Sequence, residues 1–224
     1  MGINIAIDGP AGAGKSTIAK MVAKNRGYIY VDTGAMYRAM ALHMIRENIA
    51  ADDTKAIEKA CEDADISIRY VDGEQVVLLN GENVNAYLRT EEVGNMASAS
   101  SVNGKVRAKL QLLQQKLAKE ADVVMDGRDI GTSVLPNAEV KIYLTASSYV
   151  RAKRRYDELI AKGEDADIKK IEADIIERDH RDMTRELNPL KQAEDAVYVD
   201  SSDMSIEEVV KQIEGIIEEK TGVI

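Results

Sequence analysis

Nine consecutive residues near the beginning of the chain have the types and spacing that can enclose phosphate groups. They follow the apolar run from Ile3 to Ile7 and read Gly9, Pro10, Ala11, Gly12, Ala13, Gly14, Lys15, Ser16 and Thr17. This order matches G-x-x-x-x-G-K-[ST], in which glycines let backbone N–H groups turn inward around an anion and the following helix adds its positive N-terminal end. A glycine-rich turn without a ligand is the alternative, but the apolar run before it and the helical pattern after it favour a phosphate loop.

Three side chains indicate which phosphates this loop would bind. Lys15 would neutralise the β- and γ-phosphates of a nucleotide, and its charge would act in catalysis. Ser16 offers a hydroxyl to Mg²⁺, and Asp126, directly after the run Val123 to Met125, is the expected acidic partner of that metal. The sequence therefore predicts ATP with Mg²⁺. A dinucleotide site is disfavoured, because residues 12–17 lack the third glycine of G-x-G-x-x-G.

A second anion site is indicated by residues that follow two other apolar runs. Thr33 and Arg38 come after the run Tyr28 to Val31, and Arg128 and Asp129 come after Val123 to Met125. The carboxyl ends of parallel strands meet at one edge of a sheet, so we expect these side chains at the same edge as the phosphate loop. Guanidinium groups there would bind an anion. The alternative is a tight turn with a surface ion pair.

The segment 151–187 is rich in arginine and is broken by Gly163, Glu164 and Asp165 into two helical halves. If the second helix continues past its apolar stripe of isoleucines, Arg178, Asp182 and Arg185 share one face at positions i, i+4 and i+7. The alternative is a solvated helix with ion pairs on its surface. The same two interpretations apply to a basic group at the start of the segment, which comprises Arg151, Arg154 and Arg155.

These side chains require a sheet covered by helices to hold them. Short β-branched runs alternate with helical stretches, which is typical of an α/β fold with a parallel sheet. Five strands are expected at residues 3–7, 28–31, 123–125, 140–144 and 197–199, and helices at 17–25, 105–120, 147–161 and 205–219, the last capped by Ser205 and Glu208. Residues 66–71 and 75–80 predict an antiparallel hairpin with its turn at 72–74, inserted into this alternation.

Composition excludes several classes of protein. The 30 basic and 39 acidic side chains give a net charge of −9, which would repel a nucleic-acid backbone. The single cysteine, Cys61, cannot form an intrachain disulfide, and no apolar run approaches the roughly 18 residues needed to cross a bilayer. A basic leader segment is absent from the sequence start. We expect a cytoplasmic monomer with no nucleic-acid or membrane partner.

Together these motifs resemble the bacterial cytidylate kinase family of P-loop nucleoside monophosphate kinases. The resemblance covers nearly the whole chain and is carried by the phosphate loop and by residues 32–38, 80–81, 89–93, 126–132 and 178–185. It implies a P-loop NTPase fold in one kinase unit, residues 1–224. Within it, the core would comprise residues 1–37, 111–149 and 188–224, with a nucleoside-monophosphate-binding insertion at 38–110, which would contain the small antiparallel sheet, and a helical lid at 150–187.

The resemblance also implies roles for individual residues. ATP would contact the phosphate loop and Arg154, and Lys15, Arg128, Arg178 and Arg185 would be catalytic. CMP would be bound by Thr33, Arg38, Ser98, Arg107, Arg128, Asp129, Arg178, Asp182 and Arg185. The implied activity is phosphorylation of CMP and dCMP by ATP. The alternatives are a P-loop kinase for another small acceptor, such as UMP or shikimate, and a nucleotide-dependent regulatory switch.

Overall fold

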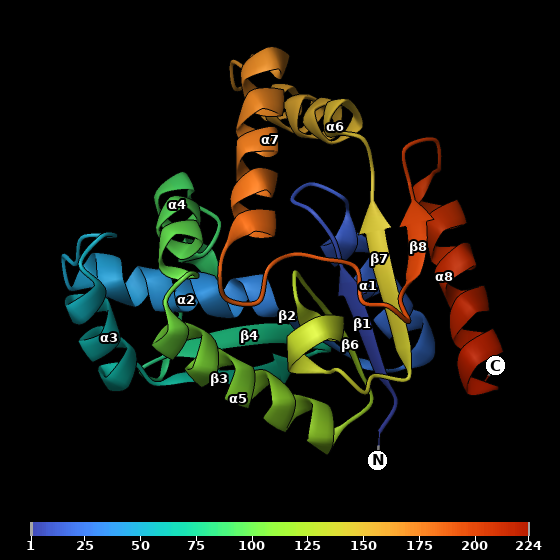
Figure 1. Cartoon of the computed structure of the whole chain (residues 1–224), viewed down its shortest axis with the longest axis horizontal. Coiled ribbons are helices and arrows are strands. Elements are labelled where there is room, and N and C mark those ends of the chain that lie inside the picture. Colours follow the sequence, from blue (N-terminus) through green and yellow to red (C-terminus); the bar gives the residue numbers. More distant parts are fainter. Residues whose placement is uncertain (1, 224) are drawn as a thin grey trace. The chain divides into compact units, whose positions relative to one another are not determined.

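The computed structural model describes residues 2–223, and the chain divides into two compact units (Figure 1). The first unit comprises residues 29–123 together with residue 2, and the second comprises residues 3–28 and 124–223. Among the described residues, no helix is both long and apolar enough to cross a membrane.

Five strands form the main sheet: β1 (Asn4–Asp8), β2 (Ile29–Asp32), β6 (Val123–Gly127), β7 (Val140–Thr145) and β8 (Val197–Asp200). Their order is β2-β6-β1-β7-β8, and both β1 with β7 and β7 with β8 pair in parallel. The apolar side chains of the three central strands β6, β1 and β7 are buried, as expected for strands covered on both faces, whereas Tyr198 in β8 at the edge of the sheet is exposed. The predicted α/β fold with a five-stranded parallel sheet is confirmed.

The helices of the second unit are α1 (Lys15–Arg26), α6 (Ser148–Ala161), α7 (Ile168–Thr184), α8 (Ile206–Thr221) and a short π-helix, η2 (Ile130–Val134). The helices predicted at 17–25, 147–161 and 205–219 are confirmed, and Ser205 and Glu208 form the predicted capping box. In Figure 1, α8 lies beside β8, and α6 and α7 lie beyond the carboxyl end of β7.

The break between α6 and α7 falls where the sequence predicts it, with Gly163 in a left-handed conformation and Asp167 capping α7. The end of α7 differs from expectation. The helix ends at Thr184, and Arg185 has an extended backbone, so the condition that would place it on one helical face with Arg178 and Asp182 is not met. The chain turns there because the Arg185 guanidinium donates to the carbonyl of Asn188, whose own φ is +49°.

The first unit contains a three-stranded antiparallel sheet, β3 (Ile66–Val71), β4 (Glu74–Leu79) and β5 (Glu82–Asn83). The predicted hairpin is confirmed, but Val71 pairs with Glu74, so its turn consists of Asp72 and Gly73 alone. Both have positive φ, as a tight two-residue turn requires. Asn80 and Gly81 form a second two-residue turn with positive φ, between β4 and β5. Strand β5 was not predicted from the sequence.

Four α-helices and one 3₁₀ turn accompany this sheet: α2 (Thr33–Arg46), α3 (Thr54–Asp63), α4 (Glu91–Ser100), α5 (Gly104–Glu120) and η1 (Asn85–Tyr87). Only α5 was predicted. Its Lys109 ammonium donates to the carbonyls of Cys61, Glu62 and Ala64, which closes the carboxyl end of α3. Cys61 is 3% exposed, and burial raises the pKa of its thiol.

Candidate functional site

The phosphate loop connects the end of β1 to the start of α1 in the second unit. Gly14 stands at the N-cap of α1 with φ +85°, and no side chain caps the helix there. The first turn of α1 contains no acidic residue, so its N–H groups remain suited to an anion. The predicted strand, loop and helix are therefore all present, and the local geometry fits phosphate binding.

Two glycines of the loop are required by close approaches of the backbone. A Cβ on Gly9, whose φ is +152°, would lie 1.9 Å from the carbonyl oxygen of Leu144 in β7. A Cβ on Gly12 would lie 3.3 Å from the Cβ of Arg151. A side chain at Gly9 therefore has no room against β7, whereas one at Gly12 would require Arg151 to shift by a few tenths of an ångström and would be strained by the φ of +75°.

Lys15 is buried at the base of the loop, and its Nζ donates to the carbonyl of Pro10 at 2.7 Å. Burial, followed by the charge of Arg128, lowers the pKa of Lys15 to about 7, although Asp126 and Asp8 act in the opposite direction. An ammonium that is costly to bury is stabilised strongly by an anion. The phosphates of a nucleotide in the loop would therefore stabilise the charged form of Lys15.

The two predicted metal ligands lie together. The Ser16 hydroxyl donates to Asp126 Oδ2 at 2.9 Å, and Asp126 is buried at the end of β6. These are the hard oxygen donors that Mg²⁺ prefers, and they fit a metal that takes its other ligands from phosphates and water. Within residues 2–223 no group of three or more His, Cys, Asp or Glu side chains could hold a metal by itself.

Asp8, at the end of β1, connects the phosphate loop to the segment after β6. Its carboxylate accepts hydrogen bonds from the backbone N–H groups of Ile130, at 2.8 Å, and Gly131, at 2.7 Å. Burial raises the pKa of this carboxyl to about 6, although the two hydrogen bonds act against burial. Asp8 was not among the residues predicted from the sequence. A carboxylate directly before Gly9, after the apolar residues Ile5 to Ile7, is the signal that could have found it.

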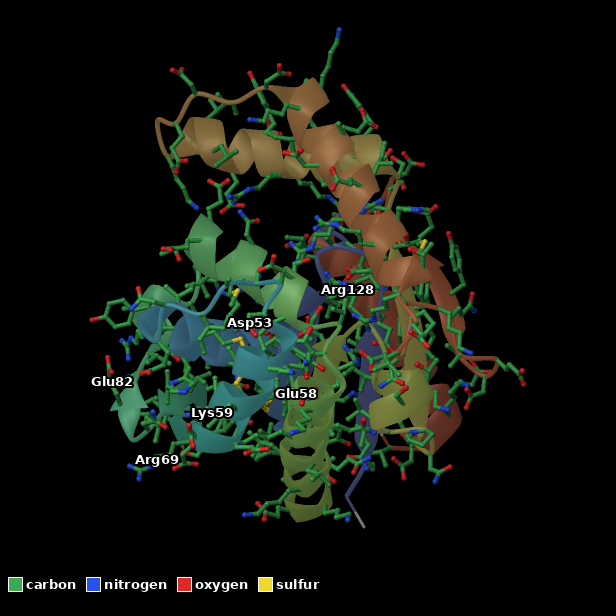
Figure 2. All side chains as sticks on the ribbon, turned by 60° about the vertical axis from the view of Figure 1, so that its left-hand side comes forward. Asp53, Glu58, Lys59, Arg69, Glu82 and Arg128 are labelled. Carbon is green, nitrogen blue, oxygen red and sulfur yellow. The ribbon has the colours of Figure 1, made fainter. Side chains whose placement is uncertain are left out.

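Four of the predicted CMP-binding residues form a charged cluster in the second unit. Arg128 Nε contacts Asp182 Oδ2 at 2.9 Å, and Arg185 contacts Asp129 Oδ1 at 3.2 Å. Figure 2 shows Arg128 near α7, which carries Asp182. Burial raises the pKa of Asp182, but the charges of Arg128, Arg178 and Arg185 outweigh burial, so this pKa is lowered. The guanidinium groups therefore hold Asp182 ionised.

The basic group at the start of α6 is divided among three environments. Arg154 donates to the Ser201 carbonyl at 2.8 Å, and its NH1 atom lies 4.0 Å from the Cβ position of Gly14, so it lies near the phosphate loop. Arg155 is half exposed and pairs with Glu158. Arg151 is buried, whereas Arg154 and Arg155 are exposed, so the solvated face that the sequence left open as an alternative does not apply to Arg151.

The remaining predicted residues lie in the first unit. Thr33 begins α2, and Asp32 caps this helix by accepting the N–H of Ala35 at 2.9 Å. Arg38 follows on α2, Ser98 lies on α4, and Arg107 on α5 is buried with its guanidinium over the ring of Tyr37.

Two further residues hold the start of α2, and the sequence analysis assigned them no role. The side-chain amide of Gln75 accepts from the backbone N–H of Asp32 and donates to its carbonyl, as a neighbouring strand would. Arg89 contacts the Asp32 carboxylate at 2.6 Å. Arg89 belongs to the motif at residues 89–93, whereas no local signal marks Gln75.

Comparison with known proteins gives consistent results. The family model described as cytidylate kinase matches residues 5–219. The cytidylate kinase of Caldicellulosiruptor bescii is 54% identical over 211 residues, which cover 94% of this chain and 93% of that protein. The cytidylate kinase of Ligilactobacillus salivarius is 50% identical over 218 residues and 97% of both chains.

Among solved structures, an uncharacterized protein from Eubacterium ventriosum has a TM-score of 0.55 at 12% identity, with 96% of this chain and 98% of that chain covered. A gluconokinase from Sinorhizobium meliloti has a TM-score of 0.51 at 14% identity, with 98% and 94% covered. At these identities the similarity concerns the fold alone.

Proposed function

This chain belongs to the cytidylate kinase family, and from that premise we propose that it transfers the γ-phosphoryl group of ATP to CMP, and also to dCMP. The observation that carries this proposal is a phosphate loop with a buried lysine in the same unit as a cluster of arginines and aspartates. Phosphoryl transfer depends mainly on positioning and on neutralising charge, which such a set of groups supplies.

ATP is the proposed donor. The backbone N–H groups of residues 9–17 would bind its phosphates, and Arg154, near Gly14, would add a further charge. Lys15 would bind the β- and γ-phosphates. Ser16 and Asp126 would hold Mg²⁺, which when bound neutralises charge on the phosphates. The Ser16 hydroxyl can keep its hydrogen bond to Asp126, because it would bind the metal through an oxygen lone pair while its proton is donated to the carboxylate.

CMP is the proposed acceptor, and its phosphate is already a nucleophile, so no strong base is needed. Arg128, Arg178 and Arg185 are proposed to act on the reacting phosphates. The Asp129 carboxylate can bind Arg185 and still accept from the amino group of cytosine, because a carboxylate has about four acceptor positions. The residues proposed to contact CMP are Thr33, Arg38, Ser98, Arg107, Arg128, Asp129, Arg178, Asp182 and Arg185.

We further propose the functional division given by the sequence, with a nucleotide-binding insertion at residues 38–110 and a lid at residues 150–187. The charge-rich sequence of α6 and α7 and their place beyond the end of β7 support a lid (Figure 1). A monomer located in the cytoplasm is proposed as well. Light scattering of the purified protein tests the monomer, because a dimer would double the measured mass.

A coupled assay of ADP release tests the activity, with CMP, dCMP, UMP, AMP and shikimate as acceptors. CMP should be the best acceptor and dCMP a good one. A clear preference for UMP or shikimate would show that this acceptor, and not CMP, is the substrate. ADP release that does not depend on any acceptor would instead indicate a regulatory ATPase.

The role of Asp129 in base selection is tested by Asp129→Ala, with Asp157→Ala on the exposed side of α6 as control. Uracil has an acceptor where cytosine has its amino donor, so a carboxylate there favours CMP. Asp129→Ala should reduce kcat/KM for CMP far more than for UMP, and the ratio should approach one. If the kcat/KM values for CMP and UMP fall by the same factor, other residues select the base.

A further inference from the structure

Arg151 is a buried arginine whose guanidinium joins three separate segments of the second unit. Its Nε donates to the carbonyl of Ala146 at 2.8 Å, and its NH1 donates to the carbonyl of Ala11 in the phosphate loop at 2.8 Å. Its NH2 contacts Asp179 Oδ2 on α7 at 2.7 Å. The planar fork of the guanidinium holds these donors at three separate nitrogens in a fixed geometry.

The contact with Ala11 fixes the orientation of a peptide group in the phosphate loop. The peptide bond between Ala11 and Gly12 is trans, so its N–H points away from its carbonyl. Since the carbonyl faces Arg151, the N–H of Gly12 faces the other side of the loop. Arg151 therefore holds one donor of the loop in the direction that an enclosed phosphate requires.

Asp179 supplies the countercharge for this guanidinium. Both residues are buried, and a buried charge without a partner is strongly unfavourable. Among the described residues, the second carboxylate oxygen, Oδ1, has no hydrogen-bond donor. Asp179 lies on the same helix as Asp182, which binds Arg128, so the contact ties the phosphate loop to the helix that carries part of the charged cluster.

We propose that Arg151 and Asp179 are a positioning pair that couples nucleotide binding in the phosphate loop to acceptor binding by α7. The proposal rests on the proposed function, because it takes α7 to contact CMP. A nucleotide that orders the loop also fixes Ala11, and through Arg151 it fixes the place of Asp179 and of the helix. Binding of the acceptor then requires less ordering, which makes the two ligands cooperative.

The test measures the dissociation constant of CMP by calorimetry, with and without a saturating non-hydrolysable ATP analogue. In the unmodified protein the analogue should tighten CMP binding by roughly 5-fold or more, in the usual range of coupling between sites. Arg151→Lys keeps the charge but replaces the fixed fork of three nitrogens with a single nitrogen, and it should reduce this factor below about 2-fold. Asp179→Asn should also reduce this factor below about 2-fold. Its amide oxygen can still accept a hydrogen bond from Arg151, but the countercharge for the guanidinium is lost.

Arg155→Lys is the matched control, because Arg155 lies on the same helix and pairs only with Glu158 in the contacts described for it. It should retain the full coupling factor. Coupling that survives in both Arg151→Lys and Asp179→Asn would overturn the proposal, as would an equal loss in Arg155→Lys. Circular dichroism verifies that each variant is folded, and Asp179→Asn is the milder of the two changes.

A second measurement needs no acceptor and separates this proposal from the proposed function. Hydrogen exchange of the Gly12 amide in the nucleotide-free protein should accelerate in Arg151→Lys and stay unchanged in Arg155→Lys. An unmodified protein that fails to bind CMP would refute the proposed acceptor while leaving this measurement intact. Unchanged exchange at Gly12 in Arg151→Lys would refute the positioning of the loop by Arg151.

Discussion

Replacement of Gly9 by alanine should disable the phosphate loop while the rest of the fold persists. The new Cβ would lie 1.9 Å from the Leu144 carbonyl oxygen, whereas real Cβ atoms essentially never approach closer than 3.0 Å. The backbone must therefore move by about 3.0 − 1.9 = 1.1 Å. Leu144 belongs to β7, which is paired with both β1 and β8, so the loop has to give way. In addition, a φ of +152° strains any L-residue by about 1 to 3 kcal/mol.

A displacement of about 1 Å at a reacting centre can reduce the rate by roughly 10²-fold. Gly9→Ala should therefore lower kcat/KM for ATP at least that far and weaken binding of an ATP analogue in calorimetry. Gly27→Ala is the control, because Gly27 also has a positive φ but would place its Cβ in open space. It should cost about 1 kcal/mol of stability and leave activity within 2-fold. The reasoning fails if Gly9→Ala keeps more than a tenth of the activity, or if Gly27→Ala loses as much.

Lys15, Asp8 and the proposed lid can each be tested separately. Lys15→Ala should lower kcat by roughly 10² to 10³, and a folded variant that retains above a tenth of it would contradict the role of Lys15. Asp8 has its pKa raised to about 6, so its contribution to stability is present below pH 3.8 and is lost as the pH rises to about 6. Denaturant unfolding from pH 3 to 7 should show the advantage of the unmodified protein over Asp8→Asn falling by roughly 3 kcal/mol, and parallel pH profiles would argue against this. Hydrogen exchange in residues 150–187 should slow with CMP plus an ATP analogue, and no change there would refute a lid.

The parts of the fold that the sequence predicts are those encoded by local patterns. The phosphate loop, the hairpin turn at Asp72 and Gly73 and the capping box at Ser205 each depend on residues within a few positions of one another. Helix α2 was missed because nine of its residues are buried, among them Met36, Ala39, Met40 and Ala41, and a helix buried on most sides shows weak amphipathic spacing.

The parts of the site that were missed depend on contacts between distant positions. Arg151 resembles any other arginine of a solvated helix until its acceptors are known, and Ala11 lies 140 residues away. Asp8 binds N–H groups 122 and 123 residues away. Arg185 was expected on a helix because charge spacing continues past Thr184, whereas its contact with Asn188 ends the helix. Such contacts leave no periodicity in the sequence.

Cys61 has a practical consequence for studying the first unit. It is the only cysteine of the chain, and it lies buried under the carboxyl end of α3, where Lys109 closes the helix. A thiol reagent can reach it only when this region opens, so the labelling rate reports the free energy of that opening under native conditions. Because Cys61 lies within residues 29–123, the reporter follows one unit of the kinase and is silent about openings confined to the other.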